Sequence, residues 1–454
     1  MYGGDEVSAI VLDVGYTSCK AGFAGEDNPK AVFPTAVGVV RSGKDGVVGK
    51  GPAAPGEKMD VDPPAAGAPA AAAAAAGTTA GTEEVKYNIG TQALSIRKDF
   101  MDIENPIQDG LIKDWDLAQK LWDHAFKDRL RIVPEEHPML LAEPSFNSNE
   151  CREKLLEIMF EHYKVPAVFI SKNAVLSSFS CGRSTAVVLD SGGGATCVAP
   201  VHEGYVLQKA IVRSPFSGEK LTEYLLSVLE GKGTNVRPPY MLNKKIGKDG
   251  TIASVTEITG LENIRPSFKR YMQKTIINDL KETVCRTSET VFDESSNAQI
   301  PFAQYELPDG KVIDVGAERF KACEIMFNPS ALEADKCSIF GVNSPSELQA
   351  LHDCINESVG KCDSDIKKDL YGTVIVTGGN TLFPMFKERL ERELAESISL
   401  LKVKTISPMA TTERRFSVWI GGSILASLGS FQQMWISKKQ WSEEGVRIVH
   451  SQCP

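Results

Sequence analysis

Short apolar runs that lead into glycines recur along the chain. Residues 10–20 read Ile-Val-Leu-Asp-Val-Gly-Tyr-Thr-Ser-Cys-Lys, and residues 185–196 read Thr-Ala-Val-Val-Leu-Asp-Ser-Gly-Gly-Gly-Ala-Thr. Apolar runs of this length are typical of buried strands, and the glycines after them favour tight turns. Both stretches share a Val-Leu-Asp-x-Gly core, so we predict two β-hairpins of the same kind. Residues 373–380 form a third apolar strand that runs into Gly378 and Gly379.

Apolar positions between these strands recur at the spacing of amphipathic helices. This spacing predicts helices over residues 114–130, 217–229 and 268–284. Asn147 and Glu150 have the spacing of a capping box, which indicates that a helix begins at Asn147.

Two segments lack either pattern. From about Arg41 to Glu84 the chain consists largely of Gly, Pro, Ala and charged residues, including the alanine run at 70–76. Such a composition buries too little apolar surface to offset the entropy of ordering, so we predict a disordered surface insertion. Residues 231–265 are polar and irregular, and we predict a second insertion there.

Composition narrows the class of protein. A chain of 454 residues has room for two or three domains. Its net charge of −9, with acidic and basic residues interspersed, argues against direct sequence-specific DNA binding, which needs a basic face. No apolar run approaches the length of a membrane span, and residues 1–6 do not resemble a signal peptide, so we expect a soluble intracellular protein without membrane contact. The ten cysteines include no Cys-x-x-Cys pair, which favours reduced thiols over disulfides or zinc.

The two hairpins also carry candidate chemistry. Glycine turns can direct successive N–H groups toward phosphate oxygens. Asp13 and Asp190 end the two strands and could hold a hydrated Mg²⁺, while Lys20 adds a positive charge just past the first turn. A single glycine hairpin of this kind is more often an ordinary turn. Its repetition favours a duplicated nucleotide site.

Several longer motifs resemble the actin family. These motifs are residues 20–27, 135–138, 305–310 and 416–437. The similarity extends over nearly the whole chain outside the two insertions. Residues 1–7, 58–62 and 202–208, together with the ending Cys453-Pro454, resemble the nuclear actin-related proteins within that family.

The resemblance implies an α/β fold of the actin-like ATPase type. This fold has two duplicated ribonuclease H-like domains, each with an accessory subdomain, and holds ATP with Mg²⁺ in the cleft between them. We expect an outer domain from residues 1–180 and 417–454, and an inner domain from residues 181–416.

The resemblance also assigns roles by position. It implies that Asp13 and Asp190 hold Mg²⁺ through water, and that Phe383 replaces a tyrosine, so that stacking is kept and a hydroxyl is lost. Without the resemblance, Lys281 and Glu282 would be interpreted as the solvated end of a helix. The residues that it places around the nucleotide are Asp13, Gly15, Tyr16, Thr17, Lys20, Asp190, Gly192, Gly193, Gly194, Lys281, Glu282, Gly378, Gly379, Asn380, Phe383 and Arg415.

Departures from the family pattern concern hydrolysis. Tyr16 and Thr17 stand where actin has a serine and a glycine, and they crowd the terminal phosphate or displace the hairpin. Asn173 replaces a glutamine that aligns the attacking water, Gly193 an aspartate, and Cys197 a histidine. Asparagine is shorter than glutamine by roughly 1.5 Å, and a misplacement of about 1 Å can cost on the order of a hundredfold in rate. We therefore predict ATP binding with little or no turnover, and no enzymatic role.

Other departures concern assembly. The alanine-rich insertion replaces the loop by which actin grips the next subunit, and residues 329–338 carry charge where actin has an apolar plug. A disordered loop makes such a contact only at an ordering cost, so we predict no filaments.

The resemblance implies a nuclear, structural subunit of chromatin-remodelling and histone acetyltransferase complexes. It would pair with actin on a helix of the large subunit and reach histones or nucleosomes through the complex. We expect that helix to dock near Val165, Phe169 and the helix containing Gly421 and Gly422. The alternative is an active actin-like ATPase that assembles with or regulates cytoskeletal actin.

Overall fold

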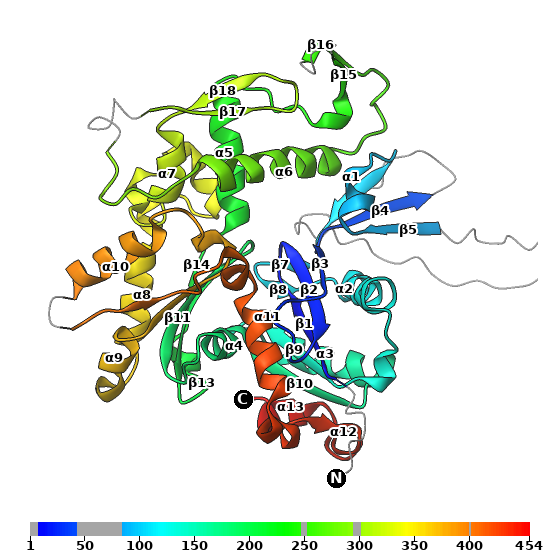
Figure 1. Cartoon of the computed structure of the whole chain (residues 1–454), viewed down its shortest axis with the longest axis vertical. Coiled ribbons are helices and arrows are strands. Elements are labelled where there is room, and N and C mark those ends of the chain that lie inside the picture. Colours follow the sequence, from blue (N-terminus) through cyan, green and yellow to red (C-terminus); the bar gives the residue numbers. More distant parts are fainter. Residues whose placement is uncertain (1–7, 43–83, 247–251, 294–300, 399–400) are drawn as a thin grey trace, which may run out of the picture.

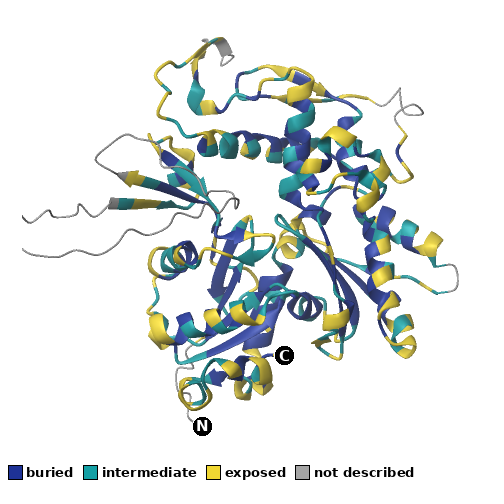
Figure 2. Cartoon of the chain, turned by 180° about the vertical axis from the view of Figure 1, so that it is seen from behind, coloured by how far each residue is buried: buried dark blue, intermediate teal, exposed yellow. Residues whose placement is uncertain are grey.

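Two lobes face each other across a central cleft in the computed structural model (Figure 1), which describes residues 8–42, 84–246, 252–293, 301–398 and 401–454. Each lobe is built on a mixed β-sheet, and each sheet is covered by helices. Buried residues concentrate in the two sheets and in the helices packed on them (Figure 2).

The sheet of the outer lobe contains the first predicted hairpin. In spatial order its strands are β21 (Ile436–Ser437), β10 (Ala167–Lys172), β9 (Met139–Glu143), β1 (Ile10–Val14), β2 (Ser18–Phe23) and β3 (Ala31–Pro34). Strands β1 and β2 are antiparallel, whereas β1, β9 and β10 run parallel. The carboxyl end of β1 therefore lies beside that of β9, which places Asp13 at the edge of the cleft.

The sheet of the inner lobe repeats this arrangement. In spatial order its strands are β13 (Tyr205–Val206), β12 (Thr196–His202), β11 (Ala186–Ser191), β19 (Val374–Thr377) and β20 (Thr405–Ile406), with β14 (Val212–Ser214) paired to β12. Strands β11 and β12 form the second predicted hairpin, and β11 is parallel to β19, which is parallel to β20. The duplicated α/β architecture predicted for the chain is confirmed.

Helices cover the sheets and connect the lobes. The α-helices of the described residues are α1 (Thr91–Ser95), α2 (Trp115–Asp123), α3 (Asn149–Glu157), α4 (Asn173–Ser180), α5 (Gly218–Gly231), α6 (Pro266–Val284), α7 (Glu318–Glu324), α8 (Leu351–Gly360), α9 (Ser364–Tyr371), α10 (Phe386–Ser397), α11 (Thr411–Ser427), α12 (Lys438–Glu444) and α13 (Ile448–Gln452). Helices α4 and α11 pack against each other between the two sheets. A Cβ at Gly421 would lie 1.8 Å from the carbonyl oxygen of Leu176, so only glycine permits this approach.

Smaller sheets complete the two lobes. They are β4 (Val37–Ser42) with β5 (Glu84–Ile89) and β6 (Met101–Glu104), β7 (Ile107–Gln108) with β8 (Leu111–Ile112), β15 (Leu242–Ile246) with β16 (Ile252–Glu257), and β17 (Ala303–Glu306) with β18 (Val312–Val315). The prediction that residues 231–265 are irregular is wrong, since β15 and β16 form an antiparallel hairpin there. The predicted insertion at 41–84 lies outside the described residues, except that Arg41, Ser42 and Glu84 belong to paired strands.

Three local expectations are corrected or confirmed by side-chain contacts. Ser148, not Asn147, caps α3, because its hydroxyl accepts a hydrogen bond from the N–H of Cys151. Val165 and Phe169 are 0% and 6% exposed, so the predicted docking groove has no open apolar surface at these residues. All ten cysteines are free thiols, as predicted. Among the described residues, none of the helices combines the length and hydropathy needed to cross a bilayer.

Candidate functional site

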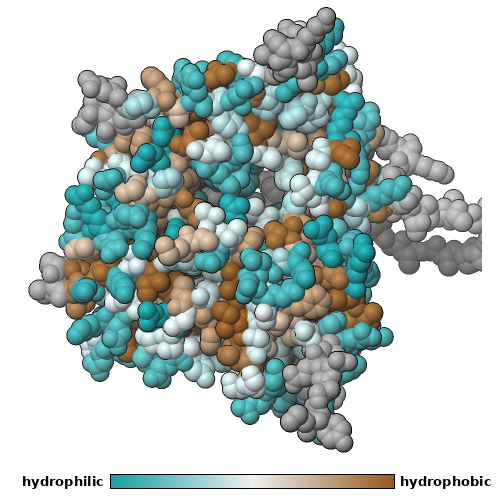
Figure 3. All heavy atoms as spheres, in the orientation of Figure 1, coloured by the Kyte–Doolittle hydropathy of each residue, from teal (hydrophilic) through white to brown (hydrophobic). Residues whose placement is uncertain are grey.

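A cavity of about 1030 Å³ lies between the two lobes. The space-filling view shows a hollow near the middle of this face, rimmed largely by hydrophilic residues (Figure 3). Both hairpins line the cavity, as do parts of α5, α6 and α11. Every residue that was predicted to surround a nucleotide lines this single cavity, and so do Asn173 and Cys197.

Two acidic side chains and one lysine meet at the base of the cavity. The ammonium of Lys20 donates a hydrogen bond of 2.7 Å to Asp13 Oδ2, because the two residues face each other across β1 and β2. Asp190 is the penultimate residue of β11 and lies beside Thr377 of β19. Burial, and then the charge of Asp13, raise the pKa of Asp190 to about 6, while Lys20 acts in the opposite direction. A buried carboxyl with a second carboxylate nearby is suited to a divalent cation, which would favour the charged form of both.

Few protein ligands surround this position. The described ranges contain no group of three or more His, Cys, Asp or Glu side chains that could hold a metal ion. Mg²⁺ keeps several of its waters and takes few carboxylates. The pair Asp13 and Asp190 therefore suits a hydrated Mg²⁺ better than a metal held by protein ligands alone.

The two hairpin tips contact each other directly across the cleft. A Cβ at Gly193 would lie 1.9 Å from Thr17 Oγ1, and a Cβ at Gly194 would lie 2.6 Å from Tyr16 Cβ. Real Cβ contacts are not this short, so the larger residues in the first turn require glycines in the second. The N–H of Gly218 also donates to the carbonyl of Gly192 at 3.0 Å, which ties the second hairpin to the start of α5.

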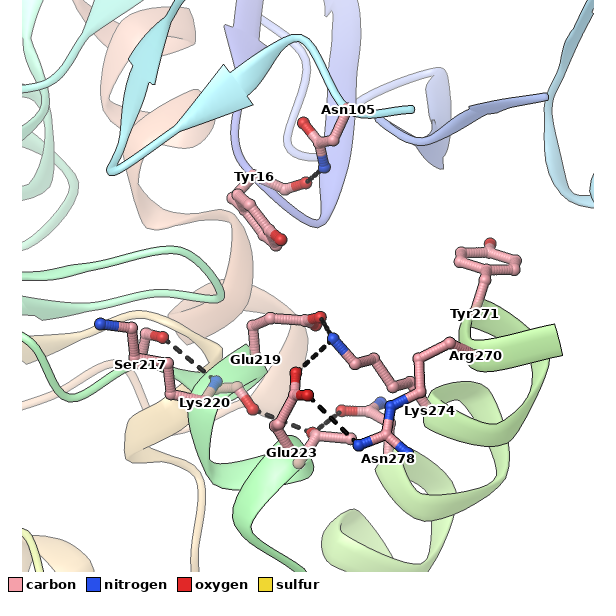
Figure 4. A network of polar contacts seen from close by, with 12 residues as sticks. Tyr16, Asn105, Ser217, Glu219, Lys220, Glu223, Arg270, Tyr271, Lys274 and Asn278 are labelled. Atoms are coloured by element: carbon pink, nitrogen blue, oxygen red, sulfur yellow. Dashed lines mark hydrogen bonds and ion pairs between the residues drawn. The ribbon is translucent and has the colours of Figure 1, made fainter. Parts of the chain in front are cut away.

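Tyr16 extends across the cleft toward a cluster of charges on α5 and α6 (Figure 4). Lys274 forms ion pairs with Glu219 at 2.7 Å and with Glu223 at 2.5 Å, and Arg270 pairs with Glu223 at 3.2 Å. Burial, and then Glu219, raise the pKa of Tyr16 to about 12, so its hydroxyl stays neutral. This cluster could not be predicted from the sequence, because nothing in the spacing of these charges shows that α5 and α6 lie side by side.

The side of the cavity predicted to hold the base contains a buried lysine. Lys281 is 5% exposed, and its ammonium donates to the carbonyl of Gly218 at 2.7 Å and to Thr222 Oγ1 at 2.8 Å. The interpretation of Lys281 as part of a solvated helix end is therefore wrong. Burial lowers its pKa to about 8. Glu282 is exposed and pairs with Arg415 at 3.1 Å, which connects α6 to α11.

Residues after β19 complete this side. Gly378 has a φ of 91°, and a Cβ there would lie 2.2 Å from the carbonyl oxygen of Ser191, so the position requires glycine. Asn380 donates to Ser191 Oγ at 3.0 Å, whereas its own Oδ1 is buried with no hydrogen-bond partner among the described residues. Such an orphaned acceptor beside a cavity is suited to a ligand that carries a hydroxyl or amino group. Phe383 is 8% exposed and presents little surface to the cavity.

The two residues at positions linked to hydrolysis, Asn173 and Cys197, have side chains that are poorly suited to act on a water molecule. Asn173 is the first residue of α4, and its Oδ1 is buried and has no partner in the described part of the chain. Cys197 lies opposite Asp190 in the hairpin, and burial followed by Asp190 raises the pKa of its thiol to about 12. A neutral thiol at physiological pH is a poor hydrogen-bond partner for a water molecule.

Comparison with known proteins places these features in a family. The family model described as Actin matches residues 4–454. The chain belongs to the actin family. It is 47% identical over 460 residues to actin-related protein 4 of Arabidopsis thaliana, with 100% of both chains covered. It is also 48% identical to the actin-related protein 4 of Oryza sativa subsp. indica and of subsp. japonica, again with 100% of both chains covered.

Membership of the actin family confirms the resemblance stated from the motifs. Actin-family folds generally bind ATP with a divalent metal in the cleft between their lobes. The paired acids, the glycine hairpins and the unpaired Asn380 Oδ1 suit such a ligand, and they lie where the two lobes meet. The individual nucleotide contacts stay predictions.

Proposed function

We propose that this chain is an ATP-binding, weakly or non-hydrolysing actin-related protein that serves as a structural subunit of nuclear chromatin-remodelling and histone acetyltransferase complexes. One observation carries the proposal. The cavity keeps both acids and both glycine hairpins of a nucleotide site, while Asn173 and Cys197 stand at the positions that would order an attacking water. This combination suits a protein that binds ATP without hydrolysing it rapidly.

Different residues of the cavity would bind the metal ion, the phosphates and the nucleoside of ATP. Asp13 and Asp190 would hold Mg²⁺ through water, and Lys20 with the glycines of the two hairpins would contact the phosphates. Mg²⁺, when bound, would supply positive charge that offsets the negative charge of the phosphates. Lys281 and Glu282 would lie near the ribose and base. A ligand that contacts both lobes stabilises their closed arrangement by mass action.

Weak hydrolysis follows from the same residues. Transfer of a phosphoryl group to water depends on positioning and on charge stabilisation, because the protein takes little part in covalent chemistry. The amide of Asn173 is short, Gly193 has no side chain, and the thiol of Cys197 is neutral. None of these groups can orient a water molecule or take its proton as well as glutamine, aspartate or histidine.

The absence of filaments is also proposed, and the surface of residues 329–338 supports it. Two 3-10 helices, Pro329–Ala331 and Ala334–Phe340, form this segment. Leu332 is 4% exposed, whereas Ala334 and Asp335 are exposed. The segment therefore offers no bulky apolar side chain for insertion between subunits. Sedimentation of the pure protein in salt that polymerises actin should leave it in the supernatant, and a pellet would refute this part.

Assembly into chromatin complexes is tested by co-purification. The full-length tagged protein, recovered from nuclei, is expected to bring down actin and a large ATPase or acetyltransferase scaffold subunit. Deletion of the helix that binds actin-related proteins in that large subunit should release both. Recovery only of cytoskeletal actin from the cytoplasm, together with rapid phosphate release, would support the alternative of an active cytoskeletal ATPase.

A further inference from the structure

A patch of aromatic, aliphatic and basic side chains lies at the surface of the inner lobe, around the first turn of α7. Figure 1 shows α7 on the far side of α5 from the outer lobe. We name these residues the α7 patch. None of them lines the cavity between the lobes, so the patch is separate from the proposed nucleotide site. Its members are Arg286, Val291, Phe292, Phe302, Arg319 and Phe320.

A stacked pair of rings forms the base of the α7 patch. The ring centres of Phe292 and Phe320 lie 5.3 Å apart, with an angle of 6° between the ring planes. Two guanidinium groups flank this pair, since that of Arg319 lies 5.1 Å and that of Arg286 lies 5.9 Å from the centre of the Phe320 ring. The N–H of Arg286 donates to the carbonyl of Arg319 at 3.1 Å, which holds the two arginines side by side. Both positive charges therefore lie against one aromatic surface.

Two large apolar side chains extend the patch into solvent. Phe302 is 69% exposed, and Val291, next to Phe292 in the chain, is 58% exposed. The ring of Phe302 lies over Gly316, just before α7, where a Cβ would be 2.7 Å from Phe302 Cε1. Single exposed apolar residues are common in proteins, but several of them around a stacked pair of rings are typical of an interaction surface.

The charges of the two arginines are not neutralised by the surrounding residues. In the described part of the chain, no carboxylate forms an ion pair with either guanidinium, and Arg319 Nη1 donates to the carbonyl of Pro301 at 3.5 Å. The acid next to Arg319 on α7, Glu318, pairs instead with Lys232. The Nε atoms of both arginines are buried and have no hydrogen-bond partner within the described ranges. These guanidinium groups are therefore suited to carboxylates from another molecule.

Charge and surface chemistry together select the class of partner. A guanidinium group binds a carboxylate through two parallel hydrogen bonds, and the exposed rings can pack against an aromatic side chain. Arginine and aromatic residues often contribute most of the binding energy of protein interfaces. Nucleic acid would need a wider basic surface, and the net charge of −9 repels a polyanion. A peptide segment with an aromatic side chain between acidic residues matches both parts of the patch.

We propose that the α7 patch binds an acidic segment of a partner protein. An aromatic side chain of that segment packs against Phe302 and Phe320, and its carboxylates pair with Arg286 and Arg319. The interaction goes beyond the proposed function and needs no nucleotide, because the patch lies outside the cleft. Since both guanidinium groups are partly exposed, binding should weaken as the salt concentration rises.

The test uses the full-length protein and a fluorescently labelled peptide of sequence Asp-Glu-Asp-Phe-Asp-Glu-Asp, with binding followed by fluorescence anisotropy. We expect saturable binding that weakens at high salt. Two matched peptides are the controls: one carries serine in place of phenylalanine, and the other carries asparagine and glutamine in place of the acids. Each control should bind roughly tenfold more weakly, because each keeps only one of the two kinds of contact.

Variants of the protein locate the binding site. Arg286→Gln combined with Arg319→Gln removes both charges, and Phe302→Ser removes the most exposed ring, so each should weaken peptide binding roughly tenfold. The matched controls are Arg129→Gln, at an exposed arginine of the outer lobe, and Tyr205→Ser, at a ring that is 57% exposed. Both should bind the peptide like the unaltered protein. If the double arginine variant fails to fold, Phe302→Ser decides, because its exposed ring contributes little to the core.

The proposal is overturned if the acidic peptide does not bind, if the neutral peptide binds equally well, or if the patch variants bind like the unaltered protein. Tighter binding of single-stranded DNA than of the peptide would also overturn it. Peptide binding that appears only after Glu294→Gln would assign the patch to residues 294–300, which join Asp293 to Pro301. Dimers in sedimentation velocity that Phe302→Ser dissociates would assign it to a second copy of the chain. Either assignment contradicts the proposal, and none of these results depends on whether ATP binds.

Discussion

The contact between the hairpin tips can be tested by adding one methyl group. In Gly194→Ala the new Cβ would lie 2.6 Å from Tyr16 Cβ, 2.7 Å from Cγ and 2.9 Å from Cδ2. Carbon atoms in van der Waals contact are about 3.5–4.0 Å apart, so the tips must separate by roughly 1 Å. The obstructing atoms lie at the base of the Tyr16 side chain, and a rotamer change cannot move its Cβ aside. Overpacking of this kind costs about 1–3 kcal/mol.

Gly192→Ala is the matched control in the same hairpin. Its new Cβ would lie 3.6 Å from the carbonyl oxygen of Ala195, which is an ordinary contact. We expect this variant to stay within about 0.5 kcal/mol of the unaltered protein. Urea unfolding of the ligand-free protein, followed by tryptophan fluorescence, measures both variants under the same conditions.

A double variant isolates the cause. Tyr16→Gly removes the atoms against which the new methyl group packs, so Gly194→Ala should cost no more than the control in that background. The difference between the two backgrounds is the interaction energy of the pair, and we expect it to account for most of the cost. Equal costs of Gly194→Ala with and without Tyr16 would refute the argument that the lobes touch at these residues.

Two further predictions concern the inner core and the thiols. Arg389 is fully buried and donates hydrogen bonds to both carboxylate oxygens of Glu324, so Arg389→Met should lower the free energy of unfolding in urea by about 3–5 kcal/mol. Arg392→Met removes an exposed ion pair and should lower it by less than about 1 kcal/mol. Similar losses in the two variants would contradict this reasoning. Burial raises the pKa of Cys197 and Cys285 from 9.0 to about 12, so unfolded thiols ionise first as the pH rises. With reductant present, the free energy of unfolding should therefore fall between pH 9 and 12, and a rise over that range would show that these thiols do not control it.

Much of the site could be predicted because its signals are local. The Val-Leu-Asp-x-Gly core in residues 10–20 and 185–196 predicted two equivalent hairpins, and the structure pairs β1 with β2 and β11 with β12. Family resemblance supplied the residues after β19 and on α6. All of them line one cavity, because the carboxyl ends of the parallel strands in both sheets point into the same cleft.

Other features depend on which elements pack together, and local patterns do not contain that information. Lys281 looked solvated on its own helix, but α5 covers it. Asp102 and Ser267 are hydrogen-bonded although they lie 165 positions apart in the chain, so no spacing rule could predict this pair. The sequence Asp249-Gly250, between β15 and β16, is typical of a hairpin turn. The flanking segments contain many polar residues, so their pattern did not predict strands.

We propose that this cleft binds ATP and keeps it intact. The most direct measurement loads the purified protein with ATP labelled at the γ-phosphate, removes free nucleotide, and follows bound ATP and released phosphate over hours. We predict stoichiometric ATP that stays bound and unhydrolysed, because the short amide of Asn173 and the neutral thiol of Cys197 are poorly suited to order an attacking water. Phosphate release as fast as that of filamentous actin, or a cleft that retains no nucleotide, would contradict the account.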